Sequence, residues 1–368
     1  MAFNLFLRYM KYKKRLIIAG ILFLLVLFIR LFSISKFNTE YYYSTGIYPY
    51  ISSFFRTITG WIPFSVGDVL YGLVAVWLVI KLCKAIRAII LKKITWIYFV
   101  KKSFSGFIKL FVIYIVFNIL WGINYNRQGI AAQLDLKIEQ YTTEDLKIIT
   151  TILLEKVNEN KAVILKNGAV LKTNTEMFQH SAAAYSVADN KFAFLQYQTS
   201  SVKSSLWSFI GNYIGFAGYY NPFTGEAQVN TSGPRFLLPF VTCHEIAHQL
   251  GYAKENEANF VGYLAASSSK DSLLLYSTYL DMFVYADRNL ASVDSVAAMS
   301  FAQQLLPAVR ADLKEMRDFN LSHKNPVEPI IRWVYGKYLQ SNQQPNGNLS
   351  YDEVTGLLIA YYKKNGTL

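Results

Sequence analysis

Cysteine and histidine are scarce in this chain of 368 residues, and acidic residues are almost missing from its first third. The only cysteines are Cys83 and Cys243, which excludes a disulfide-stabilised scaffold but not a location outside the cytoplasm. The chain has only four histidines, yet two of them, His244 and His248, stand four residues apart.

The positive charge is confined to the N-terminal third. Residues 1–123 contain 16 of the 37 Lys and Arg but only 2 of the 24 Asp and Glu, which leaves 21 and 22 for the rest of the chain. The net charge of +13 therefore comes from the N-terminal third. Because the remainder is nearly neutral and shows no basic patch, we expect no nucleic-acid partner.

Three long apolar segments occupy this basic third, at about 16–33, 64–83 and 104–123. Each is long enough to cross a bilayer as a helix. The second could instead be a buried or re-entrant helix, and the first could be a signal peptide. Arg30 interrupts the end of the first segment and two further segments follow, so we expect residues 1–123 to form an uncleaved anchor in a lipid bilayer.

The distribution of Lys and Arg around these segments predicts their orientation. Basic residues cluster before the first segment and again between 84 and 103, whereas 34–63 holds few charges and many aromatic residues. Positive flanks favour the cytoplasmic side, and aromatic residues favour the lipid–water boundary. We therefore expect a cytoplasmic N-terminus in the cytoplasmic (inner) membrane, with residues 124–368 outside the cytoplasm as a periplasmic domain.

The region 124–368 has the pattern of a single α+β domain that is mainly α. Strands are expected on both sides of the turn "NPFTG", in "IGFAGYY" and "EAQVN". Apolar residues at helical spacing predict helices elsewhere. The expected helices are 143–161, a weaker one at "NTEMFQHSAAAYSVA", and 234–250, 255–268, 271–291, 296–317, 327–341 and 350–364.

The stretch "HEIAH" at 244–248 matches the zinc-binding pattern HExxH. Residues four apart on a helix lie on one face, so His244 and His248 can both bind one Zn²⁺ ion. Glu245 projects beside them and can act as the general base that takes a proton from water. The alternative is an ordinary helix with two incidental histidines.

A third metal ligand is expected at the start of the next helix, where Glu255 and Glu257 are the candidates. Glu257 shares a helix face with Phe260, Val261 and Leu264, which predicts that it points inward. A buried carboxylate is costly unless it is compensated, and a metal would compensate it. We therefore expect Glu257 to be the third ligand and Glu255 to be solvated.

A donor for the oxyanion of the transition state should complete the site. Tyr219, Tyr220 and His180 are candidates, and we take Tyr220 as the catalytic one. We also expect the strand at 226–230, just before the histidine helix, to line the cleft and to pair with substrate backbone.

Three further residues near the motif have less distinctive patterns. Asn259 could orient a histidine ligand. Arg288 fits an ordinary helix salt bridge better than a place beside the site. Cys243 would point away from the face of the histidines, so we interpret it as a small buried apolar residue.

The motif and the helix after it resemble ImmA/IrrE-type zinc proteases, in which HExxH is followed by a Glu–Ala–Asn segment, here within "ENEANFVGYLA". The resemblance covers about 30 residues. It implies a zincin-like domain with His244, His248 and Glu257 as ligands and Glu245 as base.

Nearly the whole chain resembles a family of uncharacterised bacterial membrane proteins known chiefly from Bacteroidetes. The resemblance is carried by three N-terminal spans and by "LWGINYNR", "GYYNPFTGEAQVN", "HEIAHQLGYAKENEANF" and "SYDEVTGLLIAYY". It implies three transmembrane helices followed by a zincin-like domain with a small sheet, and it names no substrate.

The sequence therefore predicts a membrane-anchored zinc metallopeptidase that hydrolyses a peptide or protein substrate on the outer side of the cytoplasmic membrane. The alternative is a non-catalytic sensor or scaffold with a structural or ligand-sensing zinc site. Glu245 favours the enzyme, because a purely structural site does not need that carboxylate. A transporter fits poorly, because none of the three spans carries paired acids.

Overall fold

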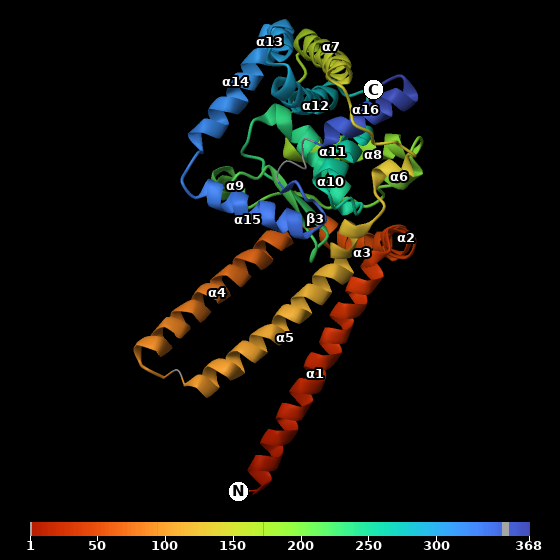
Figure 1. Ribbon diagram of the computed structural model, residues 1–368. Coiled ribbons are helices and arrows are strands. Elements are labelled where there is room, and N and C mark those ends of the chain that lie inside the picture. The colour runs from red at the N-terminus through yellow and green to blue at the C-terminus, as the bar shows by residue number, and fades with distance from the viewer. Residues whose placement is uncertain (1, 94, 172, 348–352) are drawn as a thin grey trace. The chain divides into compact units, whose positions relative to one another are not determined.

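The computed structural model describes residues 2–93, 95–171, 173–347 and 353–368 (Figure 1). The described residues are mostly helical and include one small sheet, which confirms the predicted fold class. The chain divides into two compact units, and both are discontinuous in sequence. Unit 1 is Met1–Tyr48 with Val69–Arg127, and unit 2 is Pro49–Asp68 with Gln128–Leu368.

Unit 1 contains the apolar helices. Its elements are α1 (Ala2–Ile34), α2 (Lys36–Asn38), the π-helix η1 (Thr39–Ile47), α4 (Val66–Ile90) from Val69 onward, α5 (Trp96–Leu120) and the 3-10 helix η2 (Gly122–Asn126). Lys13–Ile34, Val66–Ile90 and Trp96–Leu120 are each long and apolar enough to cross a membrane. Three apolar helices compatible with membrane anchoring are therefore present, as predicted.

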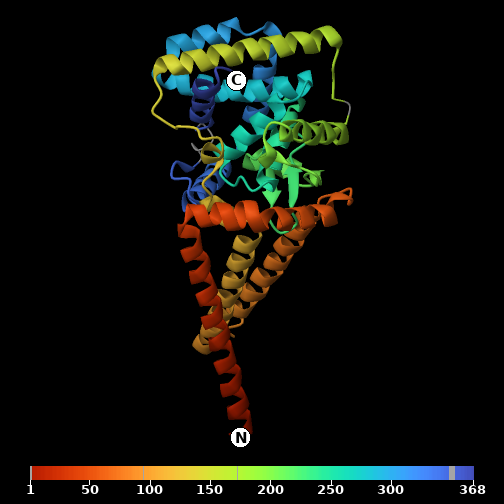
Figure 2. The same cartoon turned by 90° about the vertical axis from the view of Figure 1, so that its right-hand side faces the viewer.

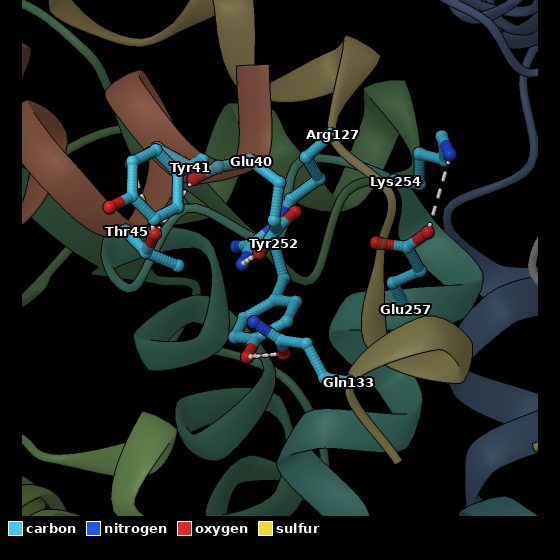
Figure 3. Close-up of polar contacts among 8 residues, drawn as sticks. All are labelled: Glu40, Tyr41, Thr45, Arg127, Gln133, Tyr252, Lys254 and Glu257. Atoms are coloured by element: carbon cyan, nitrogen blue, oxygen red, sulfur yellow. Dashed lines mark hydrogen bonds and ion pairs between the residues drawn. The ribbon is translucent and has the colours of Figure 1, made fainter. Parts of the chain in front are cut away.

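The segment after the first span is helical, as α2 and η1. Within unit 1, the Tyr43 hydroxyl donates to the backbone carbonyls of Asn118 at 3.2 Å and Ile119 at 2.9 Å. Arg127 forms a buried ion pair with Glu40 at 2.6 Å (Figure 3). These long-range contacts fix this polar, aromatic stretch within unit 1.

Unit 2 contains the remaining elements of the chain. They are α3 (Tyr48–Gly60) from Pro49 onward, α6 (Ile130–Gln133), α7 (Thr143–Asn167), α8 (Asn174–Asp189), η3 (Ala193–Leu195), β1 (Val202–Ser204), α9 (Ser208–Ile214), β2 (Gly218–Asn221), β3 (Glu226–Val229), η4 (Arg235–Leu237), α10 (Leu238–Gln249), α11 (Glu255–Ser267), α12 (Ser272–Val293), α13 (Ser295–Gln304), α14 (Pro307–Ser322), α15 (Glu328–Ser341) and α16 (Val354–Asn365).

Most predicted helices are present, with two corrections. The helix expected at 296–317 is two helices, because Pro307 lacks the backbone N–H that a continuous helix would need there. The strand expected in "IGFAGYY" is shorter and begins only at Gly218, because the short helix α9 ends just before it at Ile214 with Gly215 in the left-handed conformation. The expected start of the last helix at residue 350 lies outside the described residues.

The sheet has the order β1-β3-β2. β3 pairs in parallel with β1 and antiparallel with β2, where Gly218 lies opposite Val229 and Tyr220 opposite Ala227. Val229 and Ala227 are fully buried and belong to the main core. This face of the sheet packs against α10.

The core of unit 2 is built around α10 and α11, which lie against each other and against α8 and α12 (Figure 1). α7 runs along α12 (Figure 2). A capping box between Thr142 and Asp145 fixes the start of α7. α10 ends at Gln249, and Gly251 follows it with a φ of 87° that other residues rarely adopt.

Residues 49–68 belong to unit 2 even though they precede two of the three spans. The Ser52 hydroxyl donates to the Gln249 carbonyl at 2.6 Å, and Arg56 donates to the Thr199 carbonyl at 2.8 Å. The Glu226 carboxylate accepts the N–H groups of Val66 and Gly67 at the start of α4. The compact unit is therefore not the continuous stretch 124–368 that the sequence suggested.

Candidate metal centre

The two histidines of the motif lie side by side on α10. Their ring centroids are 4.7 Å apart, and the rings are nearly perpendicular. The Nε2 atoms of His244 and His248 face the same carboxylate oxygen, Glu255 Oε2, at 3.2 Å and 3.4 Å. Within the described part of the chain, these three buried residues are the only His, Cys, Asp and Glu group placed to hold one metal ion.

The other ring nitrogen of each histidine is fixed by an acceptor. His244 Nδ1 lies 2.7 Å from Asn259 Oδ1, and His248 Nδ1 lies 2.7 Å from the Tyr252 carbonyl oxygen. An oxygen that accepts from Nδ1–H selects the tautomer whose Nε2 carries a lone pair. Both Nε2 lone pairs then point toward Glu255 Oε2, so three electron-donating atoms converge on one point.

This convergence is unfavourable unless a cation lies among the three atoms. Glu255 Oε2 is buried and has no hydrogen-bond donor among the described residues other than the histidine nitrogens. Burial by itself would raise the pKa of Glu255, but the nearby His248 and His244 hold that pKa well below its usual range. Burial likewise lowers the pKa of His248, but the Glu255 carboxylate outweighs it and raises the pKa to about 9. The site therefore demands positive charge, which protons or a divalent metal can supply.

Two nitrogen donors and one carboxylate oxygen match the chemistry of a catalytic zinc site with three protein ligands. The observed geometry fits this set, because each ligand has a second contact that orients it. Glu255 is held from both sides, since its backbone N–H donates to Gln344 Oε1 at 3.0 Å and its Oε1 accepts from the Tyr335 hydroxyl at 2.7 Å. His244, His248 and Glu255 are thus the residues that would hold zinc.

The structure corrects the predicted third ligand. Glu255, expected in solvent, is 5% exposed and faces both histidines. Glu257, expected at the metal, instead lies 3.3 Å from Lys254 Nζ (Figure 3). The helix pattern favoured Glu257 because it took the carboxylate on the apolar face as the inward one, whereas Glu255 and every residue of α11 from Glu257 to Ala266 are buried.

The face of α11 that meets α10 is marked by a glycine. A Cβ on Gly262 would lie 3.1 Å from the backbone nitrogen of His244 and 3.3 Å from the Cys243 carbonyl carbon. Gly262, Asn259 and Glu255 are spaced three and four residues apart and so share one helix face. The sequence signal for Glu255 was therefore its position on the same helix face as Gly262 and Asn259.

We expect Gly262→Ala to destabilise the protein, because the added methyl group meets backbone atoms that cannot rotate away. The expected loss is about 1–3 kcal/mol, as for other overpacked cores. The measurement is the thermal unfolding midpoint of the full chain in detergent. Gly356→Ala in α16 is the matched control, since its Cβ would meet only Tyr141 ring atoms, at 3.5 Å and 3.9 Å. A midpoint that falls equally in both variants would contradict close packing of α10 on α11.

The hydrogen bond from His244 to Asn259 confirms that Asn259 lies where it can orient a ligand. We expect Asn259→Leu to weaken zinc binding by about 10–100-fold, as the loss of outer-sphere partners does at other zinc sites. Asn259→Asp keeps the acceptor oxygen and should retain binding close to the parent. Competition against a chromophoric chelator measures the affinity. Equal weakening by Leu and Asp would show that the contact with His244 is not what matters.

Glu245 lies beside the histidines and close to β2. Its Oε1 occupies the space into which a Cβ on Gly218 would project, at 2.5 Å, and its Oε2 has no hydrogen-bond partner among the described residues. Burial raises the pKa of Glu245 to about 7, and a cation at the adjacent ligands would lower it again. A buried carboxylate with an unused oxygen next to this His–His–Glu cluster is placed to exchange protons with a small polar molecule.

The three candidates for the oxyanion donor lie in different positions relative to Glu245. Alternation along β2 puts Tyr220 on the same face as Gly218, and therefore on the side of Glu245. Tyr219 points to the other face, where its hydroxyl donates to Asp68. His180 is partly exposed, with Nδ1 2.7 Å from Asp271. Only Tyr220 shares a strand face with the site.

The strand at 226–230 cannot pair with substrate backbone as predicted. β3 is the central strand, with both edges paired, so it cannot accept another strand. β2 is the edge strand on the Glu245 side, and it pairs with β3 alone among the described strands. The three-residue β1 that covers the other edge of β3 was too short to recognise in the sequence.

Other residues near the centre were either predicted correctly or missed. Cys243 is fully buried, and burial raises the pKa of its thiol to about 12, which confirms the apolar interpretation. Asp281 of α12 was missed: burial raises its pKa to about 6, while the charges of His244 and Arg288 lower it. Tyr335 and Gln344 were also missed, because 80 or more residues separate them from Glu255 and no spacing rule joins them.

The fold and site together define a mainly helical protein with three membrane-compatible helices and a buried His–His–Glu cluster. The chain belongs to the family described as "Protein of unknown function (DUF3810)", whose model matches residues 43–359. No curated protein and no solved structure matches the chain. The family match covers the cluster and two of the three apolar helices.

Proposed function

We propose that this protein is a membrane-anchored zinc-dependent peptidase. The observation that carries the proposal is the convergence of His244 Nε2, His248 Nε2 and Glu255 Oε2 beside the unpartnered carboxylate oxygen of Glu245. The resemblance of the motif to ImmA/IrrE-type zinc proteases adds support. A purely structural site would not require a second carboxylate that is not a ligand at this point.

When bound, zinc would polarise the scissile carbonyl and make water more acidic. Glu245 takes a proton from the attacking water as the new C–O bond forms. The same carboxyl then gives this proton to the leaving nitrogen as the C–N bond breaks. Asn259 and the Tyr252 carbonyl hold the two imidazoles in the required tautomer. Tyr220, on the same strand face as Gly218, would donate to the developing oxyanion.

The position of β2 at the edge of the described sheet supports a peptide as substrate. An extended segment can pair with an exposed strand edge through its backbone, which needs no particular side chains. Gly218 at the start of β2 lies against Glu245, so a segment paired along β2 would pass the candidate base. The substrate backbone would then be held by the sheet and cut at the end of the strand.

Incubating the full-length chain in nanodiscs with a proteome-derived peptide library tests the proposal. We expect new peptide termini in the mass spectrum, loss of cleavage after zinc is removed with 1,10-phenanthroline, and recovery on adding Zn²⁺. One zinc per chain without cleavage would instead favour a sensor or scaffold with a zinc site. A protein that binds no zinc would contradict both functions.

We also propose that unit 2 lies outside the cytoplasm. The support is the excess of Lys and Arg before the first span and between the second and third. A C-terminal alkaline phosphatase fusion should therefore be active, and a C-terminal green fluorescent protein fusion should be dark. The opposite pair of results would place the candidate centre in the cytoplasm.

A further inference from the structure

We propose that one apolar surface of unit 2 docks on the membrane and presents the metal centre to polypeptides held at the bilayer. The surface, here the α9–α15 face, comprises Leu206, Phe209, Ile210, Ile330, Trp333 and Val334. The docking does not depend on the proposed peptidase, but the substrate class does.

These apolar side chains are strongly exposed to solvent. Phe209 is 70% exposed, Ile330 62% and Trp333 64%. Leu339 is the only buried residue of α15, whose 14 residues are all described. A helix in water is normally stabilised by burying one apolar face, and contiguous exposed apolar side chains usually mark an interaction surface. We therefore expect another surface to bury the α9–α15 face.

Hydrogen bonds place one end of this face at the end of a membrane span. The Leu206 N–H donates to Asp68 Oδ2 at 2.7 Å, and the Trp207 indole donates to the Asp68 carbonyl at 3.2 Å. Asp68 is the third residue of α4, a candidate span of 25 residues. That helix is about 37 Å long, which exceeds a hydrocarbon core of about 30 Å, so a span centred in the bilayer would have its first turn at headgroup level.

The remainder of the α9–α15 face lies close to the first turn of α4. α9 has seven residues and extends only about 10 Å from its start. α15 packs against α9, and Asn325 just before α15 donates to the Tyr213 carbonyl at 2.6 Å. Both helices belong to unit 2 together with Asp68. The exposed side chains are thus tied by short contacts to a point at the lipid–water boundary.

The chemistry of the face favours lipid over a second protein. Trp333 stands among aliphatic residues, and Trp61, 79% exposed, lies five residues before the span begins. Tryptophan in such positions is typical of membrane interfaces. The exposed cations Arg332 and Lys337 of α15 can reach lipid phosphates while their stems cover apolar surface. A bilayer covers all these side chains at once without a specific partner.

Tyr335 connects this face to the metal centre. It lies on α15 between Trp333 and Lys337, and its hydroxyl donates to Glu255 Oε1. A helix resting on lipid would therefore hold a ligand of the centre within one side chain of the membrane surface. The polypeptides best placed to enter are lipid-attached chains and the outer flanks of membrane-spanning proteins.

Depth-dependent quenching tests the docking. In a Cys83→Ser background, an environment-sensitive fluorophore is attached to Trp333→Cys, Phe209→Cys or Val296→Cys in the full chain. Val296 is the control, because it is 77% exposed on α13 and outside the face. Nanodiscs of phosphatidylethanolamine and phosphatidylglycerol carry doxyl-labelled lipids. Labelled proteins are used only if they match the parent in thermal midpoint and elution volume.

We expect severalfold stronger quenching and blue-shifted emission at 333 and 209 than at 296. Equal quenching at all three positions would overturn the docking, as would quenching that appears only in discs holding two chains. Because this result requires neither zinc nor cleavage, a failed peptidase assay leaves it intact.

The substrate class is tested separately with the peptide library, prepared with and without an N-terminal palmitoyl chain. Faster cleavage of the acylated peptides by the chain in nanodiscs supports bilayer-held substrates, and equal rates overturn that class. Absence of all cleavage counts against the proposed peptidase, which separates the two failures.

Discussion

Glu255→Gln is expected to abolish stoichiometric zinc binding. The neutral amide removes the only negative charge at the point where both Nε2 atoms converge, at 3.2 Å and 3.4 Å. Loss of a direct ligand should exceed the roughly 10–100-fold cost in affinity of losing an outer partner. Zinc per chain, measured by plasma mass spectrometry on the full-length protein, is expected to fall from one toward zero.

Glu257→Gln is the matched control, because it makes the same chemical change two residues away. Glu257 is also buried, at 7% exposure, but its Oε1 faces Lys254 rather than the histidines. We expect this variant to keep one zinc per chain. Zinc lost from Glu257→Gln and kept by Glu255→Gln would restore the ligand assignment that the helix pattern first suggested.

Glu245→Gln is expected to separate metal binding from catalysis. Glutamine has nearly the same shape and cannot take a proton from water, so cleavage should fall by about 10²–10⁴-fold, the usual contribution of a general base. Zinc should stay at one per chain, because Glu245 is not among the converging ligands. Library cleavage and zinc content are measured on the same preparation.

Glu315→Gln, an exposed position on α14, controls for the loss of one negative charge. It should cleave like the parent. A Glu245→Gln variant that also cleaves like the parent would remove Glu245 from the proposed reaction. A variant that loses zinc would show that Glu245 contributes to holding the metal.

The features predictable from sequence were those set by local periodicity. Apolar length predicted the three span-like helices, and the four-residue spacing placed His244 and His248 on one face of α10. Both rules depend only on helix geometry. They hold whatever else the chain packs against.

The features that could not be predicted from sequence depend on tertiary contacts. To choose between Glu255 and Glu257, one must know which side of α11, a nearly fully buried helix, meets α10. The position of β3 in the sheet depended on the three-residue β1, which pairs with it across a long connection. Tyr335 and Gln344 reach Glu255 from a helix and a turn much later in the chain. Periodicity carries no information about such partners.

The discontinuity of unit 2 has a consequence for the order in which the protein can fold. Ser52, Arg56 and the backbone of Val66 find their partners at Gln249, Thr199 and Glu226, more than 140 residues later in the chain. Contacts so distant in sequence form late, because the intervening chain must be made first. Residues 49–68 must therefore wait, with α4 and α5 already made, until the sheet and α10 arrive. A fragment that starts at residue 124 would lack residues 49–68 and with them part of unit 2.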